Sequence, residues 1–144
     1  MGLTRMSGPV YGAKALLWSA SFNSTSALST SAATAFGAVR VPAGETWFVT
    51  ELNAYRGSTH STTTVVGLTD DSTVIGTVAL TSSLAGVIGS TTLATTAGEY
   101  EGTEVAANST LALTLQEGTS SIAGQDLTAW VYGFRRFLSS TRAE

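Results

Sequence analysis

Few residues in this sequence could carry out chemistry, and His60 is the first to consider. It is the only histidine, and the chain contains no cysteine. A zinc site needs about four ligands, and a catalytic triad needs a nucleophile and an orienting group, so one imidazole cannot supply either alone. His60 lies between Thr59 and Ser61 in a hydroxyl-rich segment. We therefore expect it to be a solvated loop residue.

Carboxylates form two further groups. Asp70 and Asp71 are adjacent, but calcium prefers about six to eight oxygen ligands and the Asp-x-Asp-x-Asp spacing is absent, so we expect a polar turn. Glu99, Glu101 and Glu104 are close in sequence. General acid–base catalysis requires an enclosed site that perturbs carboxyl pKa values, whereas a glutamate-rich loop is usually solvated. The sequence thus predicts no enzymatic activity, no metal site and no cofactor.

Composition indicates the elements that hold these residues. Charged residues make up 12% of the chain, about half of the ordinary share, while serine and threonine together number 42, from 18 Ser and 24 Thr. A helical protein would need many more charged and glutamine side chains on its surface, whereas threonine is β-branched and favours strands. A net charge of −3 also argues against nucleic-acid binding, which normally needs a basic patch. Composition therefore predicts an all-β protein.

Length and hydropathy bound the organisation of the chain. A chain of 144 residues suits one domain that buries roughly two-thirds of its unfolded surface. The apolar run at 15–18 is shorter than the core of a signal peptide, and no segment approaches the roughly 20 apolar residues of a membrane span. We expect no membrane contact, an extended N-terminal arm at 1–14, one domain at 15–138 and a tail at 139–144.

The segment Val41–Tyr55 is the most informative of the predicted elements. Pro42 fixes its own φ and Gly44 can adopt a positive φ, so the chain is well suited to turn sharply before Glu45. A strand follows, in which strict alternation places both apolar and polar side chains on each face. This mixed pattern suits a strand whose two ends face different surroundings, for example a core at one end and a partner at the other.

Turn residues separate the other predicted strands. These lie at 15–22, 35–41, 62–68, 73–80, 84–93, 109–116 and 126–137. The tight polar turn at 69–72 predicts a hairpin, and parallel pairing would need crossover helices that the connections cannot hold. We therefore predict an antiparallel β-sandwich of about eight strands. The expected core residues are Trp18, Trp47, Val49, Leu111, Leu113, Leu115 and Trp130.

A short internal repeat makes this prediction more specific. The segments Val41–Trp47 and Val105–Leu111 share the form Val-x-Ala-(Gly/Asn)-x-Thr-apolar. Gly44 and Asn108 occupy the same place in the pattern, and these two residue types tolerate a left-handed turn position best. The same turn is therefore expected twice. Two equivalent turns in an all-β domain favour a jelly roll, which contains two Greek keys.

Four of these motifs together resemble the small jelly-roll virion proteins of tailed bacteriophages. They are Val41 to Trp47, Glu101 to Val105, Leu111 to Leu115, and Val131 to Phe134. The resemblance implies a capsid decoration (cement) protein, commonly a trimer, that binds the outer surface of the phage head and stabilises the lattice of the major capsid protein. It implies assembly in the host cytoplasm and a final location in the virion. Such proteins more often have glycine where this chain has Asn108.

The arm at 1–14 is the segment expected to cross onto a neighbouring subunit, since so short an arm gains order only by docking. Its candidate contact residues are Arg5, Pro9, Tyr11 and Lys14.

Two alternatives remain open at this point. The first is a tail or head–tail connector protein, which differs from a decoration protein in copy number. The second, from another class, is a carbohydrate-binding β-sandwich, which requires exposed aromatic residues on one face. Trp47, Trp130, Tyr132 and Phe134 are expected in a core or an interface instead, because their strands also contain Val and Leu as core strands do.

Overall fold

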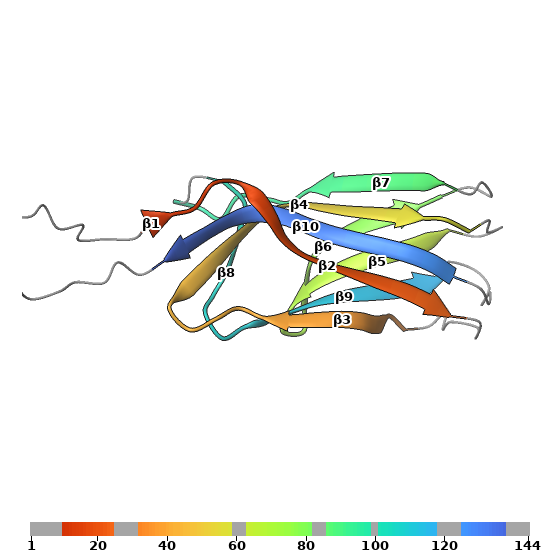
Figure 1. The fold of residues 1–144 in the computed structure, drawn as a ribbon, viewed down its shortest axis with the longest axis horizontal. Coiled ribbons are helices and arrows are strands. Elements are labelled where there is room, and N and C mark those ends of the chain that lie inside the picture. The colour runs from red at the N-terminus through yellow and green to blue at the C-terminus, as the bar shows by residue number, and fades with distance from the viewer. Residues whose placement is uncertain are drawn as a thin grey trace, which may run out of the picture.

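The computed structural model describes residues 10–24, 32–58, 63–81, 86–98, 101–117 and 125–137, and in these ranges the chain is all-β (Figure 1). The strands are β1 (Val10–Tyr11), β2 (Ala15–Ser24), β3 (Thr34–Arg40), β4 (Glu45–Arg56), β5 (Thr64–Asp70), β6 (Thr73–Leu80), β7 (Val87–Thr92), β8 (Thr103–Val105), β9 (Thr110–Glu117) and β10 (Gln125–Phe137). None of the described ranges contains a helix that is long and apolar enough to cross a membrane. The predicted fold class is confirmed.

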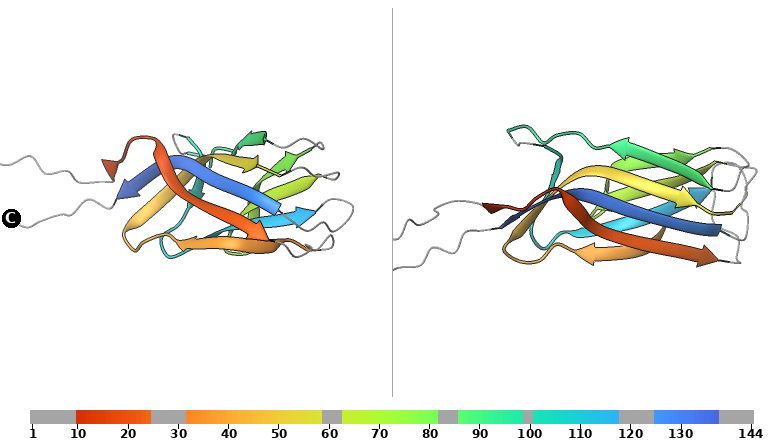
Figure 2. Two further views of the ribbon diagram at one scale, coloured as in Figure 1. Left: turned by 45° about the vertical axis from the view of Figure 1, so that its right-hand side comes forward. Right: turned by 45° about the horizontal axis from the view of Figure 1, so that its top comes forward.

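The strands form two antiparallel sheets packed face to face (Figures 1 and 2). In the six-stranded sheet, β10 lies between β4 and the consecutive strands β1 and β2, while β7 and β8 both pair with the far side of β4. The four-stranded sheet has the order β3-β9-β5-β6. β1 and β2 both pair with β10, and β7 and β8 both pair with β4, so each of these couples occupies one strand position in the sheet. Counted in this way, the sandwich has eight strand positions.

The pairing of these positions is nested. The first strand position pairs with the last, β3 pairs with β9, β4 pairs with the β7–β8 position, and β5 pairs with β6. A long hairpin folded over on itself produces this order, which is that of a jelly roll. The hairpin predicted at 69–72 is confirmed, and Asp71 in its turn has a φ of 53°.

The core lies between the sheets and is aliphatic with one tryptophan. Of the predicted core residues, Trp47, Val49, Leu111, Leu113 and Leu115 are buried there. Trp18 is half-buried and packs against the margin of the core, close to Gly37 of β3. Trp130 is outside the core cluster, and its assignment to the core is wrong.

A bulge in β4 explains the mixed pattern of that strand. Tyr132 of β10 is opposite Glu51, but the next residue, Gly133, is opposite Val49, so Thr50 is an extra residue. An extra residue reverses the alternation, and Val49 before the bulge and Leu52 after it therefore face the same core. The alternation assumed in the sequence analysis is broken at Thr50, and this accounts for the apolar and polar residues on each face; a partner at one end of the strand stays a prediction.

β2 carries a matching bulge on the other side of β10. Val131 is opposite Trp18 and Tyr132 is opposite Leu16, which leaves Leu17 as the extra residue. Leu17 enters the core, whereas Leu16 is 50% exposed on the outer face. Gly133 lies between the two bulges, where a Cβ would overlap the carbonyl oxygen of Phe48 and approach Leu17 Cδ1 at 2.9 Å. Only glycine fits at this crossing.

The repeated turn predicted from sequence is present in both places. Gly44 has a φ of 84° and Asn108 a φ of 69°. Each turn is closed by one backbone hydrogen bond, from Glu45 N to the Pro42 carbonyl (3.1 Å) and from Ser109 N to the Ala106 carbonyl (3.2 Å). The two turns also bond to each other, because Val41 N donates to the Ser109 carbonyl and Asn108 N to the Val41 carbonyl, both at 2.9 Å.

The described part of the predicted arm belongs to the sandwich. Val10 is opposite Phe137 and Tyr11 opposite Arg136, and Gly12 N donates to the Arg135 carbonyl at 2.7 Å. Residues 10–12 therefore pair with the end of β10 in the six-stranded sheet. The remainder of the arm, residues 1–9, and the tail at 139–144 lie outside the described residues.

Truncation of Trp47 tests the position of the core. Trp47 is 3% exposed, and its Nε1 donates to Glu45 Oε2 at 2.8 Å. We expect Trp47→Ala to lower the free energy of unfolding by about 3–5 kcal/mol, as large core deletions do. Urea denaturation followed by circular dichroism measures this change. Val74→Ala is the control, since Val74 is 59% exposed and its truncation should cost less than about 0.5 kcal/mol. A near-neutral Trp47→Ala would contradict the packing.

Substitution at Asn108 tests the left-handed turn. Asn108→Ala should cost about 1 kcal/mol, because alanine at positive φ brings its Cβ against the backbone, whereas Asn108→Gly should be close to neutral. Gly44→Ala is the matched change in the other turn and should cost a similar amount. Urea denaturation of all three variants gives the comparison. Equal stability of the Ala and Gly variants at position 108 would rule out the positive φ.

Candidate functional site

The predicted contact residues of the arm fall into two groups. Arg5 and Pro9 lie outside the described residues, and Tyr11 is placed by its backbone opposite Arg136. Lys14 Nζ forms an ion pair with Glu101 Oε1 at 3.3 Å, and both side chains are exposed. Lys14 therefore binds within its own chain, and the ion pair is of the exposed kind that contributes about 0–1 kcal/mol.

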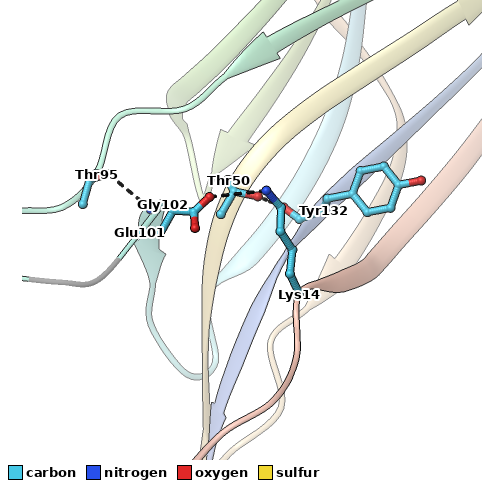
Figure 3. Close-up of polar contacts among 6 residues, drawn as sticks. All are labelled: Lys14, Thr50, Thr95, Glu101, Gly102 and Tyr132. Carbon is cyan, nitrogen blue, oxygen red and sulfur yellow. Dashed lines mark hydrogen bonds and ion pairs between the residues drawn. The ribbon is translucent and has the colours of Figure 1, made fainter.

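The Lys14–Glu101 ion pair ties together two distant segments across the outer face of the six-stranded sheet (Figure 3). Lys14 precedes β2 and Glu101 precedes β8, and β10 and β4 lie between these strands. Two further hydrogen bonds are drawn with the pair in Figure 3: Thr50 Oγ1 donates to the Tyr132 carbonyl at 3.2 Å, and Gly102 N donates to Thr95 Oγ1 at 3.4 Å.

Arginines and aromatic rings meet at the end of the sandwich where β10 finishes. The Arg135 guanidinium lies 5.2 Å from the ring centre of Trp47, and that of Arg136 lies 4.9 Å from the ring centre of Phe48. Arg136 also forms an ion pair with Glu104 at 3.4 Å. Both guanidiniums thus lie over rings of β4, where cation–π attraction favours them. We call this region the charged end.

The predicted acidic cluster is divided by these contacts. Glu101 pairs with Lys14 and Glu104 pairs with Arg136, while Glu99 lies outside the described residues. Among the described residues, no group of three or more His, Asp or Glu side chains could hold a metal ion. His60 is also outside the described residues.

Asp70 and Asp71 serve the β5–β6 turn. Asp71 Oδ1 accepts a hydrogen bond from Thr110 N at 3.0 Å, and Asp71 N donates to the Thr110 carbonyl at 2.8 Å, so this aspartate joins the hairpin to β9. Asp70 Oδ1 is buried with no hydrogen-bond partner. Burial raises the pKa of Asp70 above its ordinary value of 3.8, and the neighbouring Asp71 charge adds to this, while a hydrogen bond with Ser109 opposes it.

The outer face of the six-stranded sheet carries three aromatic side chains that the sequence had assigned elsewhere or passed over. Ala129 and Val131 of β10 point into the core, so Trp130 and Tyr132 point outward. On β4, Tyr55 also points outward and is 38% exposed. The Tyr132 ring extends from β10 away from the Lys14–Glu101 pair (Figure 3). We call Tyr55, Trp130 and Tyr132 the aromatic face.

Asn53 lies at the centre of the aromatic face. It is directly opposite Trp130 on β10 and Ser90 on β7. Tyr55 is two residues away on the same strand, and Tyr132 occupies the diagonal position on β10. Asn53 is only 7% exposed, and its Nδ2 is buried with no hydrogen-bond partner. A buried donor left unpaired costs free energy, so it is a group that a ligand acceptor would stabilise.

In the sequence of β10, small and large residues lie on opposite faces of the strand. Between 126 and 137 the residues on one face include Ala129 and Gly133, which are small, and those on the other include Trp130, Tyr132 and Phe134, which are large. At Gly133 the core-facing side has no room for a side chain, because the two bulged strands approach closely there. Size alone therefore gives the wrong orientation. Asn53 showed no signal of its own, because its burial depends on neighbours from other strands.

Asp70→Asn tests the pH dependence that follows from the raised pKa of Asp70. Ionisation of Asp70 is disfavoured in the folded state, so at pH values above its folded pKa the ionised carboxylate lowers the free energy of unfolding. This loss of stability disappears as the pH falls through 3.8, below which the carboxyl group is mostly protonated in the unfolded chain as well. We expect Asp70→Asn to be more stable than wild type at pH 7, by less than about 1 kcal/mol because solvent screens the part of the carboxyl group that remains exposed, and equally stable near pH 3.5. Urea denaturation at both pH values measures this, with Asp126→Asn as a charge-matched control. A gain that is independent of pH would contradict the assignment.

Comparisons with known proteins add no identification to this geometry. No protein-family model, no curated protein and no solved structure matches the chain. The functional interpretation therefore depends on the strand order, on the charged end and on the aromatic face.

Proposed function

We propose that this protein is a structural virion component, a capsid decoration protein that binds the outer surface of a phage head. Two arguments support the proposal. The sequence motifs at 41–47, 101–105, 111–115 and 131–134 resemble those of small jelly-roll virion proteins. The nested strand pairing is also that of a jelly roll, an architecture that viral capsid proteins use. Because one fold can host many functions, the proposal also needs support from the surfaces of the molecule.

The observation that carries the proposal is the meeting of the first and last described residues of the chain. Val10 in β1 is paired with Phe137 at the end of β10, so both lie at the charged end beside Arg135 and Arg136 (Figures 1 and 2). Arg5 and Arg142 lie beyond these two points in the sequence and are outside the described residues. We propose that the charged end, together with the sequence that precedes Val10, makes the contact with the shell.

The proposed partner is the major capsid protein, and the proposed assembly is a homotrimer on the shell. The described surface is rich in hydroxyl groups and poor in charge, so its burial against protein removes few ions from water. Stabilisation of the capsid lattice requires no chemical step, so we propose no enzymatic activity and no cofactor. We propose that the protein joins the particle in the host cytoplasm and is afterwards located in the virion.

Removal of residues 2–9 tests the docking of the arm. This variant keeps β1 and its pairing with β10, so it should give the wild-type circular dichroism spectrum. We expect it to bind empty heads built from the major capsid protein at least about tenfold more weakly than wild type, a loss of about 1.4 kcal/mol. Val74→Ala, on the four-stranded sheet, should bind like wild type. Undiminished binding of the shortened chain would remove the arm from the contact, and absence of binding by wild type would overturn the proposed function.

Copy number separates a decoration protein from a connector. Quantitative mass spectrometry of purified virions should find this chain in a fixed ratio to the major capsid protein and in many copies. A connector protein would be present in only a few or in dozens of copies per particle. Sedimentation equilibrium of the free protein tests the trimer.

A further inference from the structure

The aromatic face is a surface that the proposed docking does not use. It lies on the part of β4 and β10 beyond the Thr50 bulge, whereas the first and last described residues, Val10 and Phe137, meet at the charged end. Ile88 of β7, directly opposite Tyr55, is 68% exposed and extends the apolar surface at one margin. Hydroxyl groups border it as well, since Ser19 is opposite Trp130 on the β2 side.

The spacing of the rings follows from the sheet. Trp130 and Tyr132 are two residues apart on one strand, which separates them by about 7 Å, and Tyr55 lies diagonally from Trp130 on the neighbouring strand at about 7–8 Å. The three rings therefore form a continuous row across β4 and β10. A row of rings on a rigid sheet offers a succession of flat apolar surfaces to an extended ligand.

The polar groups around the rings select the chemistry of that ligand. Asn53 Nδ2 is a donor without a partner between the rings, and Ser19, Ser90 and Thr128 supply hydroxyl groups on the same face. Such groups bond neutral hydroxyls. The charges here are acidic: Glu51 is opposite Tyr132, and Asp126 of β10 is exposed on the same face beyond Thr128, so an anionic ligand would be repelled. The face therefore complements an uncharged ligand with both apolar and hydroxyl surfaces.

We propose that the aromatic face binds a neutral polysaccharide chain. A sugar ring has an apolar C–H face that can stack on Tyr55, Trp130 or Tyr132, and a rim of hydroxyls that can accept from Asn53 Nδ2 and exchange hydrogen bonds with the neighbouring serines and threonine. Tyr and Trp are suited to such contacts because each has an apolar body and a polar group. This binding is independent of the proposed attachment to the capsid, because the two use different surfaces.

Affinity electrophoresis provides the test. Wild-type protein is run in native gels that contain dextran, laminarin, galactomannan or xyloglucan, and retardation gives the dissociation constant. At least one of these neutral polysaccharides should retard the wild type. Trp130→Ala should bind at least about tenfold more weakly, because aromatic residues at the centre of a contact are those whose truncation costs most. Val74→Ala, an exposed apolar residue of the opposite sheet, should bind like wild type.

Asn53→Ala separates a binding role from a structural one. Its unpaired Nδ2 contributes no hydrogen bond to the fold, so urea denaturation should show no loss of stability, while retardation should be weakened about threefold or more. Loss of stability without loss of retardation would overturn the role of Asn53 in binding. Circular dichroism verifies that each variant is folded.

Two results would overturn the proposal as a whole. One is the absence of retardation in all four polysaccharides. The other concerns the Trp130→Ala variant: sedimentation equilibrium would show that an oligomer formed by the wild type has dissociated, while retardation in the gels is unchanged. The face would then be an interface between copies of this chain. Capsid binding is measured separately, and Trp130→Ala should bind empty heads like wild type. Failure of polysaccharide binding with intact capsid binding would therefore leave the proposed function standing.

Discussion

The close crossing of three strands at Gly133 determines the geometry of the six-stranded sheet. A side chain at this position would overlap the Phe48 carbonyl on one side and Leu17 on the other. Each flanking strand inserts one extra residue here, Leu17 in β2 and Thr50 in β4, and a bulge of this kind reverses the alternation and increases the local twist. The core therefore receives Trp47 and Val49 from one side of the β4 bulge and Leu52 and Ala54 from the other. The aromatic face is the opposite surface of the same arrangement.

The two repeated turns hold the sheets in register near this crossing. One connects β3 to β4 and the other connects β8 to β9, so each takes the chain from one sheet to the other. Because Val41 exchanges hydrogen bonds with Asn108 and Ser109, neither turn can shift without the other. Val41 and Val105 are both fully buried beneath them. The short internal repeat in the sequence is thus the signature of two connections that stabilise each other.

The sequence predicted those features that depend on a few neighbouring residues. The turn chemistry of Gly44 and Asn108, the hairpin at Asp71 and the alternating leucines of β9 all follow from local rules, and together they were enough for the fold class. The bulges could not be predicted, because an extra residue is defined by the partner strand and not by its own neighbours. The error at Trp130 has the same origin. A large aromatic residue is assigned to a core by its size, but the space on each face of a strand depends on how closely distant strands approach it.

The distribution of charge explains how two surfaces of different chemistry coexist on so small a domain. At the charged end, Arg135 and Arg136 lie over the rings of Trp47 and Phe48, so these cations are held close to β4, near the paired residues Val10 and Phe137. Aromatic residues therefore have different surroundings on the two sides of the Thr50 bulge. Before the Thr50 bulge, the rings of β4 are buried and attract cations; beyond it, the rings of β4 and β10 stand at the surface among hydroxyl groups. The bulge that brings Trp47 into the core also turns Asn53 and Tyr55 outward, so packing and surface chemistry are set by the same extra residue.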